Sequence, residues 1–260
     1  MSVRVLLVRT AGTNCDQESA RAFAMAGAEP MFVHINRLMR EPALLREARI
    51  CMIPGGFTYG DDIAAGKILA HEIRTRLLGP FRDFIRSGRL VLGVCNGFQV
   101  LIKAGLLPDP FADEPTATLG WNDSNRFEAR WVRMRIDSNR SAFLRDTGRI
   151  IELPVAHGEG KFIPRDANVL RRLQDGGQIV LRYCGPHGES VGYPGNPNGS
   201  VDAIAGICDP SGRVLGLMPH PERNVVLTHH PRWTRGEAPA VPDGLAFFTN
   251  AVEYARTLHV

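Results

Sequence analysis

Residues 90–101, LVLGVCNGFQVL, join two different kinds of segment at a single cysteine. The first part is an apolar run without alternation, which is typical of a strand buried on both faces of a sheet. Residues 97–106 then read as a helix. Gly93 and Gly97 flank Cys95 in the pattern G-x-nucleophile-x-G, which indicates a sharp strand-to-helix turn that lifts the central side chain clear of the sheet. The stretch therefore predicts an α/β sheet with a thiol where one strand ends.

The rest of the first half repeats this succession of strands and helices. Apolar strands are expected at 3–8, 31–35, 48–53 and 89–94. Helices are expected after Thr13 or Asn14, either of which could be the cap, up to Gly27, and across 63–85 with a break near Gly79-Pro80. Strands without alternation, interleaved with helices, indicate an open, mostly parallel sheet covered on both faces.

The second half follows another pattern. Its apolar segments alternate partly and are separated by turn signals, which predicts antiparallel strands added to the sheet, at 126–136, 149–156, 178–183 and 201–218. Residues 243–258 read as a closing amphipathic helix. No repeat, low-complexity tract or clear linker interrupts the chain, so we expect one α/β domain over residues 1–260.

Composition narrows the class of protein. The chain has 260 residues, 44% of them hydrophobic and 22% charged, as in ordinary globular proteins, and a net charge of +4. Its basic residues are scattered, so we predict no nucleic-acid partner. The apolar run after Arg4 is too short for a signal peptide or a membrane span, so we predict a cytoplasmic protein with no membrane partner. The five cysteines are widely spaced without a CxxC, which predicts neither a disulfide framework nor a zinc knuckle.

Cys95 allows two interpretations. The unpaired N–H groups and the dipole at the start of the following helix would favour a thiolate, as a nucleophile requires. The alternative is a cysteine packed in the core, with the glycines marking a tight turn. The local pattern is short and leaves both open.

His220 has the most constrained setting of the histidines, in MPHPER at 218–223. Pro221 disfavours helical geometry at His220, and in an extended segment Glu222 would lie on the same side and could orient the imidazole. The segment follows an apolar strand, and ligands bind at the carboxyl ends of strands in open α/β sheets. A lone loop histidine would more often bond to backbone, but Cys95 together with this setting favours a catalytic base.

Acyl transfer also needs donors for an oxyanion. Gly55 and Gly56, in PGGFTYGD at 54–61, could present backbone N–H groups without side-chain obstruction, and the N–H of Asn96 directly follows the nucleophile. The alternative for the glycine pair is a plain glycine-rich turn.

Sites for nucleotides and metals are not predicted. GDDIAAGK at 60–67 resembles a phosphate loop, but it has five residues between its glycines and Ile68 where a Ser or Thr would hold magnesium. His229-His230 has no neighbouring carboxylate or cysteine pattern. We therefore predict no metal and no ATP site in this chain.

Three motifs in order, PGGFTYGDD, GVCNGFQVL and MPHPERN, closely resemble class I (triad) glutamine amidotransferases. Within that class they are similar to the glutaminase subunits of phosphoribosylformylglycinamidine synthases, through Asn-Gly-Phe-Gln after the cysteine and through GGFTYGDD. AHGEGKF at 156–162, NPNGSVDAIAGI at 196–207 and the arginine after Glu222 support this. The resemblance implies a flavodoxin-like fold with added antiparallel strands.

The resemblance also implies roles for residues. Cys95 would attack the side-chain amide of L-glutamine, giving a γ-glutamyl thioester and ammonia, with His220 as base and Glu222 orienting it. Gly55, Gly56 and Asn96 would hold the oxyanion. The resemblance further assigns glutamine contacts to Phe57, Gln99 and His157.

In this family ammonia goes to a separate synthetase subunit, which uses ATP and Mg to convert formylglycinamide ribonucleotide. The resemblance therefore implies a synthetase partner, a small bridging subunit, and weak glutaminase activity of this chain alone. Residues 122–130 match only loosely, and 225–243 form a longer loop than expected, which could cover the site, contact a partner or be solvated surface.

Two other classes of function stay open at this point. One is a γ-glutamyl hydrolase or cysteine peptidase on a related scaffold, acting without a synthetase. The other is a non-catalytic relative, against which the presence of Cys95, His220 and Glu222 together argues.

Overall fold

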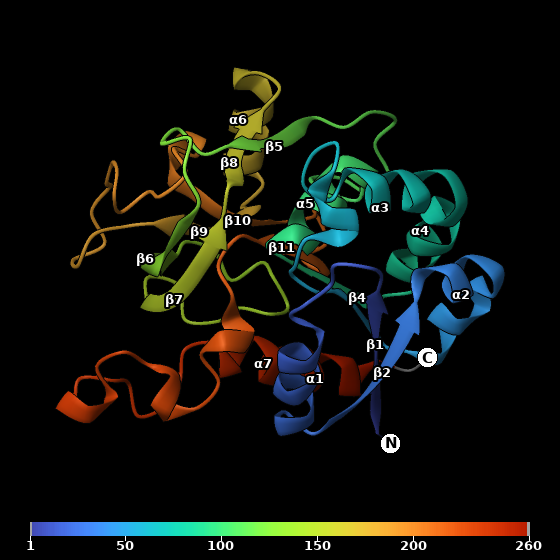
Figure 1. Cartoon of the computed structure of the whole chain (residues 1–260), viewed down its shortest axis with the longest axis horizontal. Coiled ribbons are helices and arrows are strands. Elements are labelled where there is room, and N and C mark those ends of the chain that lie inside the picture. Colours follow the sequence, from blue (N-terminus) through green and yellow to red (C-terminus); the bar gives the residue numbers. More distant parts are fainter. Residues whose placement is uncertain (1, 259–260) are drawn as a thin grey trace.

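The parallel half of the sheet forms from four apolar runs of the first half of the chain and one strand of the second half. The computed structural model describes residues 2–258. Its main sheet has nine strands in the order β2-β1-β3-β4-β11-β10-β9-β6-β7 (Figure 1). The first five, which pair in parallel, are β2 (Ala28–His34), β1 (Val3–Arg9), β3 (Ile50–Ile53), β4 (Leu90–Val94) and β11 (Val214–Leu217). β3, β4 and β11 are buried along their whole length, which explains why they do not alternate.

The second half adds antiparallel strands to this sheet, as expected, except that the end of the segment at 201–218 forms β11, which pairs antiparallel with β10 but parallel with β4. The antiparallel strands are β10 (Ile204–Cys208), β9 (Ile179–Tyr183), β6 (Glu128–Ile136) and β7 (Ile150–His157). The structure also contains elements that the sequence patterns do not predict. They are β5 (Ala117–Trp121) and β8 (Glu159–Pro164), which form a separate two-stranded sheet, and the helices α6 (Ala167–Asp175) and α2 (Ile35–Arg40). The mostly parallel sheet with added antiparallel strands is confirmed.

Helices cover both faces of the parallel half. α1 (Asp16–Met25) and α7 (Leu245–Thr257) lie on one side, and α3 (Lys67–Glu72), α4 (Leu78–Arg86) and α5 (Asn96–Ala104) lie on the other (Figure 1). The short α2 (Ile35–Arg40) follows β2.

Two helix boundaries differ in an instructive way from their expected positions. α1 begins after Cys15, and neither expected cap is used: Thr13 Oγ1 accepts a hydrogen bond from the N–H of Thr10, and Asn14 Oδ1 accepts one from Sγ of Cys15. The helix expected over 63–85 begins only at Lys67, and it is interrupted by a π-helical turn at 73–77, shortly before Gly79-Pro80. Pro80 has no N–H to donate to the carbonyl of residue 76, so the regular bonding pattern cannot continue there.

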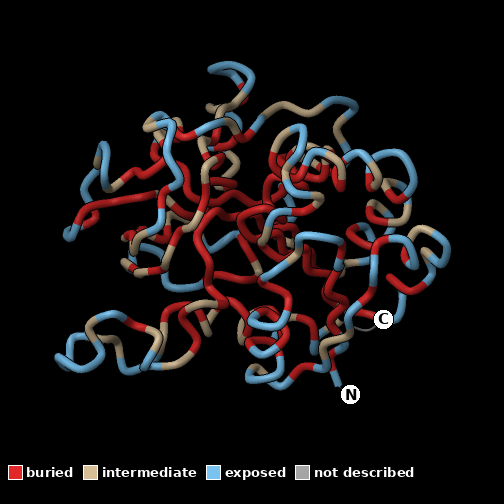
Figure 2. Tube along the Cα trace, viewed as in Figure 1, coloured by how far each residue is buried: buried red, intermediate tan, exposed pale blue. Residues whose placement is uncertain are grey.

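The buried side chains form one cluster that extends through both halves of the sheet (Figure 2). Because this core is continuous, we propose that the whole chain forms one domain. No helix within residues 2–258 is long and apolar enough to cross a membrane.

Strand pairing brings the two ends of the candidate site together. β11 lies beside β4 in parallel, with Leu217 opposite Val94. Both strands therefore end at the same edge, where Cys95 follows β4 and the segment with His220 follows β11. The N–H of Cys95 donates to the carbonyl of Leu217 at 2.8 Å and fixes this alignment.

Candidate active site

Cys95 is the only residue between β4 and α5, and its backbone is strained. It has φ 51° and ψ −106°, in the positive-φ region that residues with a Cβ rarely adopt. Such a conformation costs on the order of 1–3 kcal/mol and persists only where the surroundings impose it. Here Gly97 allows the close approach of α5 to β3, because a Cβ at Gly97 would overlap the carbonyl oxygen of Ile53. The predicted sharp turn from strand to helix is present.

Cys95 is 5% exposed and lies at the end of β4, beside the end of β11. Its Sγ is 3.6 Å from the carbonyl oxygen of Ala156, near the end of β7. The imidazole of His220 is another polar neighbour of this thiol, since the charge of Cys95 raises the pKa of His220.

His220 and Glu222 form a buried pair. The Nδ1 of His220 lies 2.6 Å from Oε1 of Glu222, and both side chains are almost inaccessible. The N–H of His220 donates to the carbonyl of Pro154 at 2.9 Å, which holds the backbone in an extended conformation. The predicted contact is thus confirmed, but its geometric reason differs: Pro221–Arg223 form a 3-10 turn, which folds Glu222 back onto the ring.

This pairing leaves one ring nitrogen free. Nε2 of His220 is buried and has no hydrogen-bond partner among the described residues. Burial lowers the pKa of His220, but the charge of Glu222, followed by that of Cys95, outweighs it and raises the pKa well above its ordinary value. His220 is therefore suited to accept and hold a proton beside Cys95.

The loop after β3 supplies free backbone donors. Gly56 has φ 146°, and a Cβ there would lie 2.6 Å from the carbonyl oxygen of Gly12, so only glycine fits. Within residues 2–258 the N–H groups of Gly55 and Gly56 donate to no recorded acceptor. Asn96 begins α5, so its N–H has no acceptor inside the helix.

The Asn96 side chain ties this loop to α5. Its Oδ1 accepts from Oγ1 of Thr58 at 2.7 Å, and its Nδ2 donates to Oδ1 of Asp61 at 3.0 Å and to Oε1 of Gln99 at 3.1 Å. The sequence patterns do not single out Thr58 or Asp61. Their position shortly after the glycine pair could have identified them, because residues there must face the start of α5.

Gln99, expected to contact glutamine, is 2% exposed and bonded to the protein at both ends of its amide. Its Nε2 donates to the carbonyl of Glu159 at 2.5 Å, and its Oε1 accepts from Asn96. Glu159 in turn accepts from the N–H of Ala65 at 3.1 Å and lies 3.5 Å from Nζ of Lys103. In this structure Gln99 belongs to a buried network that holds β8 and the 58–66 loop on α5.

His157 is also buried, at the end of β7. Its Nδ1 lies 3.0 Å from Oδ1 of Asn122, and its Nε2 has no recorded partner among the described residues. Burial, with the nearby charge of His220 as the next cause, lowers the pKa of His157 to about 3. His157 is therefore neutral at physiological pH, close to the His220–Glu222 pair.

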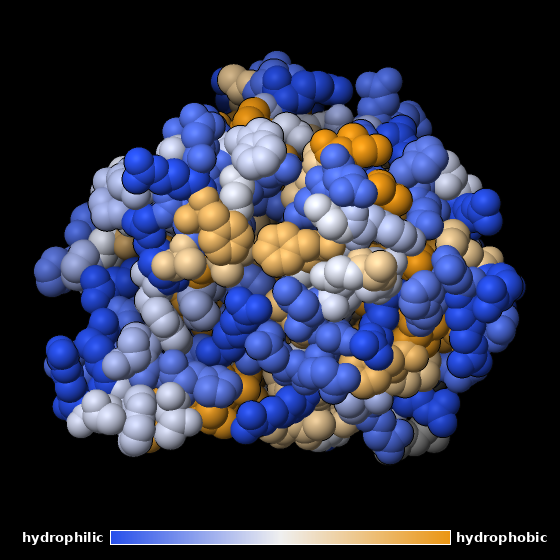
Figure 3. Space-filling view, in the orientation of Figure 1, coloured by the Kyte–Doolittle hydropathy of each residue, from blue (hydrophilic) through white to orange (hydrophobic). Residues whose placement is uncertain are grey.

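Phe57 borders the site on its exposed side. It is 45% exposed and its ring centroid lies 6.3 Å from that of Phe127, which is 53% exposed. Trp121, 68% exposed, lies beside Gly158 and so beside the turn that follows His157. Figure 3 shows hydrophobic side chains gathered near the middle of one face of the molecule.

The loop at 225–243 extends away from α5 (Figure 1). It contains two 3-10 turns, at 227–229 and 233–235, and projects to the side beyond α1 and α7 (Figure 1). Its base is anchored, since the buried His230 lies 3.1 Å from Glu152 and against the ring of Trp131.

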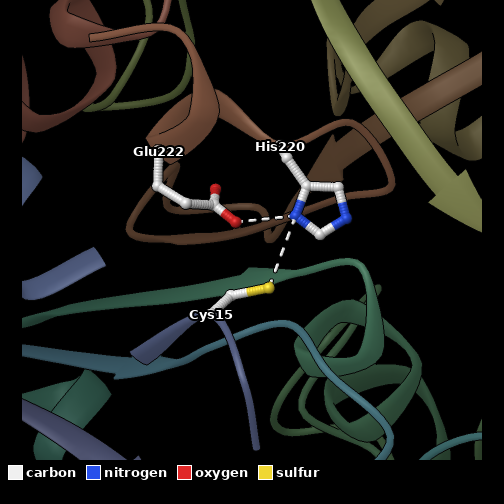
Figure 4. A group of neighbouring side chains, drawn as sticks. All are labelled: Cys15, His220 and Glu222. Atoms are coloured by element: carbon white, nitrogen blue, oxygen red, sulfur yellow. Dashed lines mark hydrogen bonds and ion pairs between the residues drawn. The ribbon is translucent and has the colours of Figure 1, made fainter. Parts of the chain in front are cut away.

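The sequence patterns miss one neighbour of the pair. Cys15, the residue before α1, has its Sγ 4.0 Å from Nδ1 of His220 and points toward it together with Glu222 (Figure 4). Nη2 of Arg223 donates to this sulfur at 3.1 Å. Its place after β1 could have identified it, because the carboxyl ends of parallel strands lie at one edge of the sheet.

A known protein family matches almost the whole chain. The CobB/CobQ-like glutamine amidotransferase domain covers residues 2–255. A phosphoribosylformylglycinamidine synthase subunit PurQ from Dehalococcoides mccartyi is 45% identical over 256 residues, which are 98% of each chain. The corresponding subunit from Archaeoglobus fulgidus is 37% identical over 98% of each chain.

Solved structures agree with this. A chain of the PurLQS structure from Thermotoga maritima superposes with a TM-score of 0.75 at 30% identity, covering 98% of this chain and 99% of that one. A second Thermotoga maritima protein, a glutamine amidotransferase, has a TM-score of 0.52 at 17% identity over 99% of this chain and 94% of its own, which shows a shared fold.

Proposed function

Because the chain belongs to the family of CobB/CobQ-like glutamine amidotransferases, we propose that it hydrolyses L-glutamine as the glutaminase subunit of a phosphoribosylformylglycinamidine synthase. The observation that carries the proposal is the arrangement of Cys95 at a strained strand–helix joint beside the buried His220–Glu222 pair. A nucleophile, a base and an orienting carboxylate at one sheet edge are the parts that acyl transfer requires.

In the first half-reaction the Cys95 thiolate attacks the side-chain carbonyl carbon of glutamine. The oxygen of the tetrahedral intermediate is held by the N–H groups of Gly56 and Asn96, with Gly55 completing the turn that presents them. His220 donates a proton from Nε2 to the departing nitrogen, and ammonia leaves. A γ-glutamyl thioester remains on Cys95.

In the second half-reaction Nε2 of His220 accepts a proton from water, which attacks the thioester. The Cys95–carbonyl bond then breaks and glutamate is released. Glu222 holds Nδ1 throughout, so the imidazole keeps the orientation and the tautomer that the reaction needs. Contacts of Phe57, Gln99 and His157 with glutamine stay part of the proposal; for Gln99 they would require its amide to exchange a partner.

The ammonia would pass to a synthetase subunit, which uses ATP and Mg to convert formylglycinamide ribonucleotide, with a small third subunit bridging the two. The exposed aromatic side chains of Phe57, Phe127 and Trp121 beside the site support a docking surface there, since clustered exposed apolar side chains commonly mark protein contacts. The PurLQS structure from Thermotoga maritima is the corresponding precedent.

The test measures ammonia release from glutamine with and without the synthetase, the bridging subunit and formylglycinamide ribonucleotide. We expect slow release by this chain alone and marked stimulation in the complete complex. Release that is fast alone and indifferent to the partners would overturn the proposal and favour a stand-alone γ-glutamyl hydrolase.

A further inference from the structure

Three potential metal ligands meet at the Nδ1 edge of His220. They are Sγ of Cys15, Nδ1 of His220 and a carboxylate oxygen of Glu222, all within 4.8 Å of one another and all buried (Figure 4). Cys15 comes from the joint before α1, and the other two come from the segment after β11. The cluster is distinct from the Nε2 edge of the ring, which the proposed reaction uses.

The donor set selects the kind of ion. A thiolate, an imidazole and a carboxylate are ligands that Zn²⁺ accepts together, whereas Mg²⁺ and Ca²⁺ take oxygen ligands. We propose that Cys15, His220 and Glu222 form an inhibitory zinc site that switches off glutamine hydrolysis. This inference concerns the regulation of the triad and rests on the proposed function.

The geometry needs only small adjustments. Tetrahedral zinc, with bonds of roughly 2.0–2.3 Å, separates its nitrogen and oxygen ligands by about 3.3 Å and its nitrogen and sulfur ligands by about 3.5 Å. The observed separations are 2.6 Å between Nδ1 and Oε1 and 4.0 Å between Nδ1 and Sγ. The first must open and the second must close, each by less than 1 Å, which side-chain torsions can provide.

The site also has an approach for the ion. A cavity of about 370 Å³ reaches Glu222 from the side of α1 and is lined by Glu18, Arg21, Glu222, Arg223, Val225 and His229. Oε2 of Glu222 is buried without a hydrogen-bond partner among the described residues. It can therefore turn toward the ion, or it can accept a hydrogen bond from a water molecule that is the fourth ligand. Burial raises the pKa of Cys15, so zinc must displace the thiol proton; Arg223, whose Nη2 donates to Sγ of Cys15, acts in the opposite direction and favours the thiolate.

Zinc binding would block glutamine hydrolysis by fixing which nitrogen of the His220 ring carries the proton. Zinc takes the lone pairs of Sγ and Nδ1, so the thiol proton of Cys15 leaves to solvent and the proton on Nδ1 is displaced. A neutral imidazole that holds a metal on Nδ1 carries its remaining proton on Nε2. Nε2 then cannot accept a proton from Cys95 or from water. Ammonia-dependent synthesis by the partner subunit needs no glutaminase and would continue.

The direct test uses Co²⁺ as a spectroscopic substitute for zinc on the full-length Cys95→Ser chain, which leaves Cys15 as the thiolate nearest to His220. We expect a thiolate-to-cobalt charge-transfer absorption at one equivalent, displaced by Zn²⁺. It should be absent from the Cys95→Ser, Cys15→Ser double variant, whose fold is checked by circular dichroism. Absorption that persists in the double variant, or that never forms with Cys15 present, would overturn the inference. This readout needs no turnover, so its failure is separable from failure of the proposed function.

The functional test measures zinc inhibition of glutaminase activity in the assembled complex. Cys15→Ser should raise the inhibitory zinc concentration by at least roughly 100-fold, because even changes outside the ligand shell cost metal sites 10–100-fold in affinity. Cys184→Ser is the matched control, since Cys184 is buried and outside the cluster, and it should respond to zinc as the unchanged chain does. Equal inhibition of the Cys15→Ser variant would place zinc on Cys95 instead and overturn the inference.

Discussion

Cys95 and Cys15 stand at two similar joints with different outcomes. Each is the last residue before a helix that follows a parallel strand, and both lie near His220. Only Cys95 separates β4 from α5, whereas residues 10–15 separate β1 from α1. The one-residue joint forces φ to 51°, while the longer one lets Cys15 relax to φ −99°.

The difference in length also decides what each thiol contacts. Sγ of Cys15 donates to Oδ1 of Asn14 at 3.1 Å and accepts from Arg223, so its bonding capacity is used. Among the described residues Cys95 makes one hydrogen bond, at 3.6 Å to the carbonyl of Ala156, and it lies near His220. We therefore propose that a place at this edge of the sheet is not enough to make a cysteine a nucleophile, and that the tight joint, which leaves Cys95 with fewer bonding partners than Cys15, is also needed.

The largest expected effect in this comparison belongs to Cys95→Ala. Without the nucleophile, glutamine-dependent turnover of the complex should fall by on the order of 10⁴-fold or more. Synthesis from added ammonia should continue, because it bypasses this chain. Loss of both activities would mean that Cys95 serves the fold or the assembly instead.

Glu222→Gln tests how the imidazole of His220, which lies near both cysteines, depends on its carboxylate partner. A glutamine can still bond to Nδ1, but it neither stabilises a charged imidazole nor selects the same tautomer, so kcat/KM should fall by roughly 10²–10⁴-fold. Steady-state kinetics of the complex measure this. Glu41→Gln, an exposed carboxylate after α2, is the matched control and should have no effect. A loss below tenfold would remove Glu222 from the triad.

Gly97→Ala tests the tight joint through stability. The new Cβ would overlap the Ile53 carbonyl, so the free energy of unfolding should fall by about 3 kcal/mol or more. This corresponds to a decrease of roughly 6–12 °C in Tm, measured by calorimetry. Gly79→Ala is the control, since nothing lies within 4 Å of its added Cβ. Equal Tm values for the two variants would show that α5 can move away from β3 without loss of stability.

His157 provides a pH-dependent test beside the joint. Its pKa of about 3 lies below that of the unfolded chain, so the fold favours the neutral ring. The resulting stability is fully present above the unfolded pKa, about 6.5, and is lost as pH falls toward 3, at up to about 1.4 kcal/mol per pH unit.

The His157→Gln variant should therefore lose less stability than the unchanged chain between pH 6.5 and pH 4, measured by denaturant unfolding. The exposed His187→Gln variant should follow the unchanged chain. Parallel curves for all three proteins would contradict the burial argument.

The smallest effect is expected for Cys15→Ala in the absence of zinc. The ring loses a packing neighbour and Arg223 loses an acceptor, but Glu222 still holds Nδ1. We expect glutaminase activity to fall by roughly fivefold or less, which is under about 1 kcal/mol. A loss comparable to that of Cys95→Ala would erase the distinction between the two joints.

Much of this site follows from local sequence patterns. G-x-C-x-G indicates the joint because only glycine allows both close approaches, and PHPE indicates a constrained histidine with a carboxylate beside it. The 3-10 turn that brings Glu222 to Nδ1 was not foreseen, because a spacing of two residues fits either an extended segment or a tight turn.

Other features depend on contacts between residues far apart in the chain. Cys15 precedes His220 by 205 residues, so no spacing rule connects them, and a search for neighbouring ligands predicts no metal site. The hydrogen-bond network of Asn96, Thr58, Asp61 and Gln99 also joins residues that are far apart in the chain. The sequence therefore does not show that the Gln99 side chain is bonded to other parts of the protein.

The sequence by itself determined the class of the sheet, the strained joint at Cys95 and the pairing of His220 with Glu222, because each depends on backbone geometry within a few residues. Only the tertiary structure decided what surrounds them. The parallel alignment of β11 with β4 brings His220 to Cys95, and the position of β1 brings Cys15 to the opposite edge of the ring. Strand order is set by packing of the whole core, and short patterns carry no information about it.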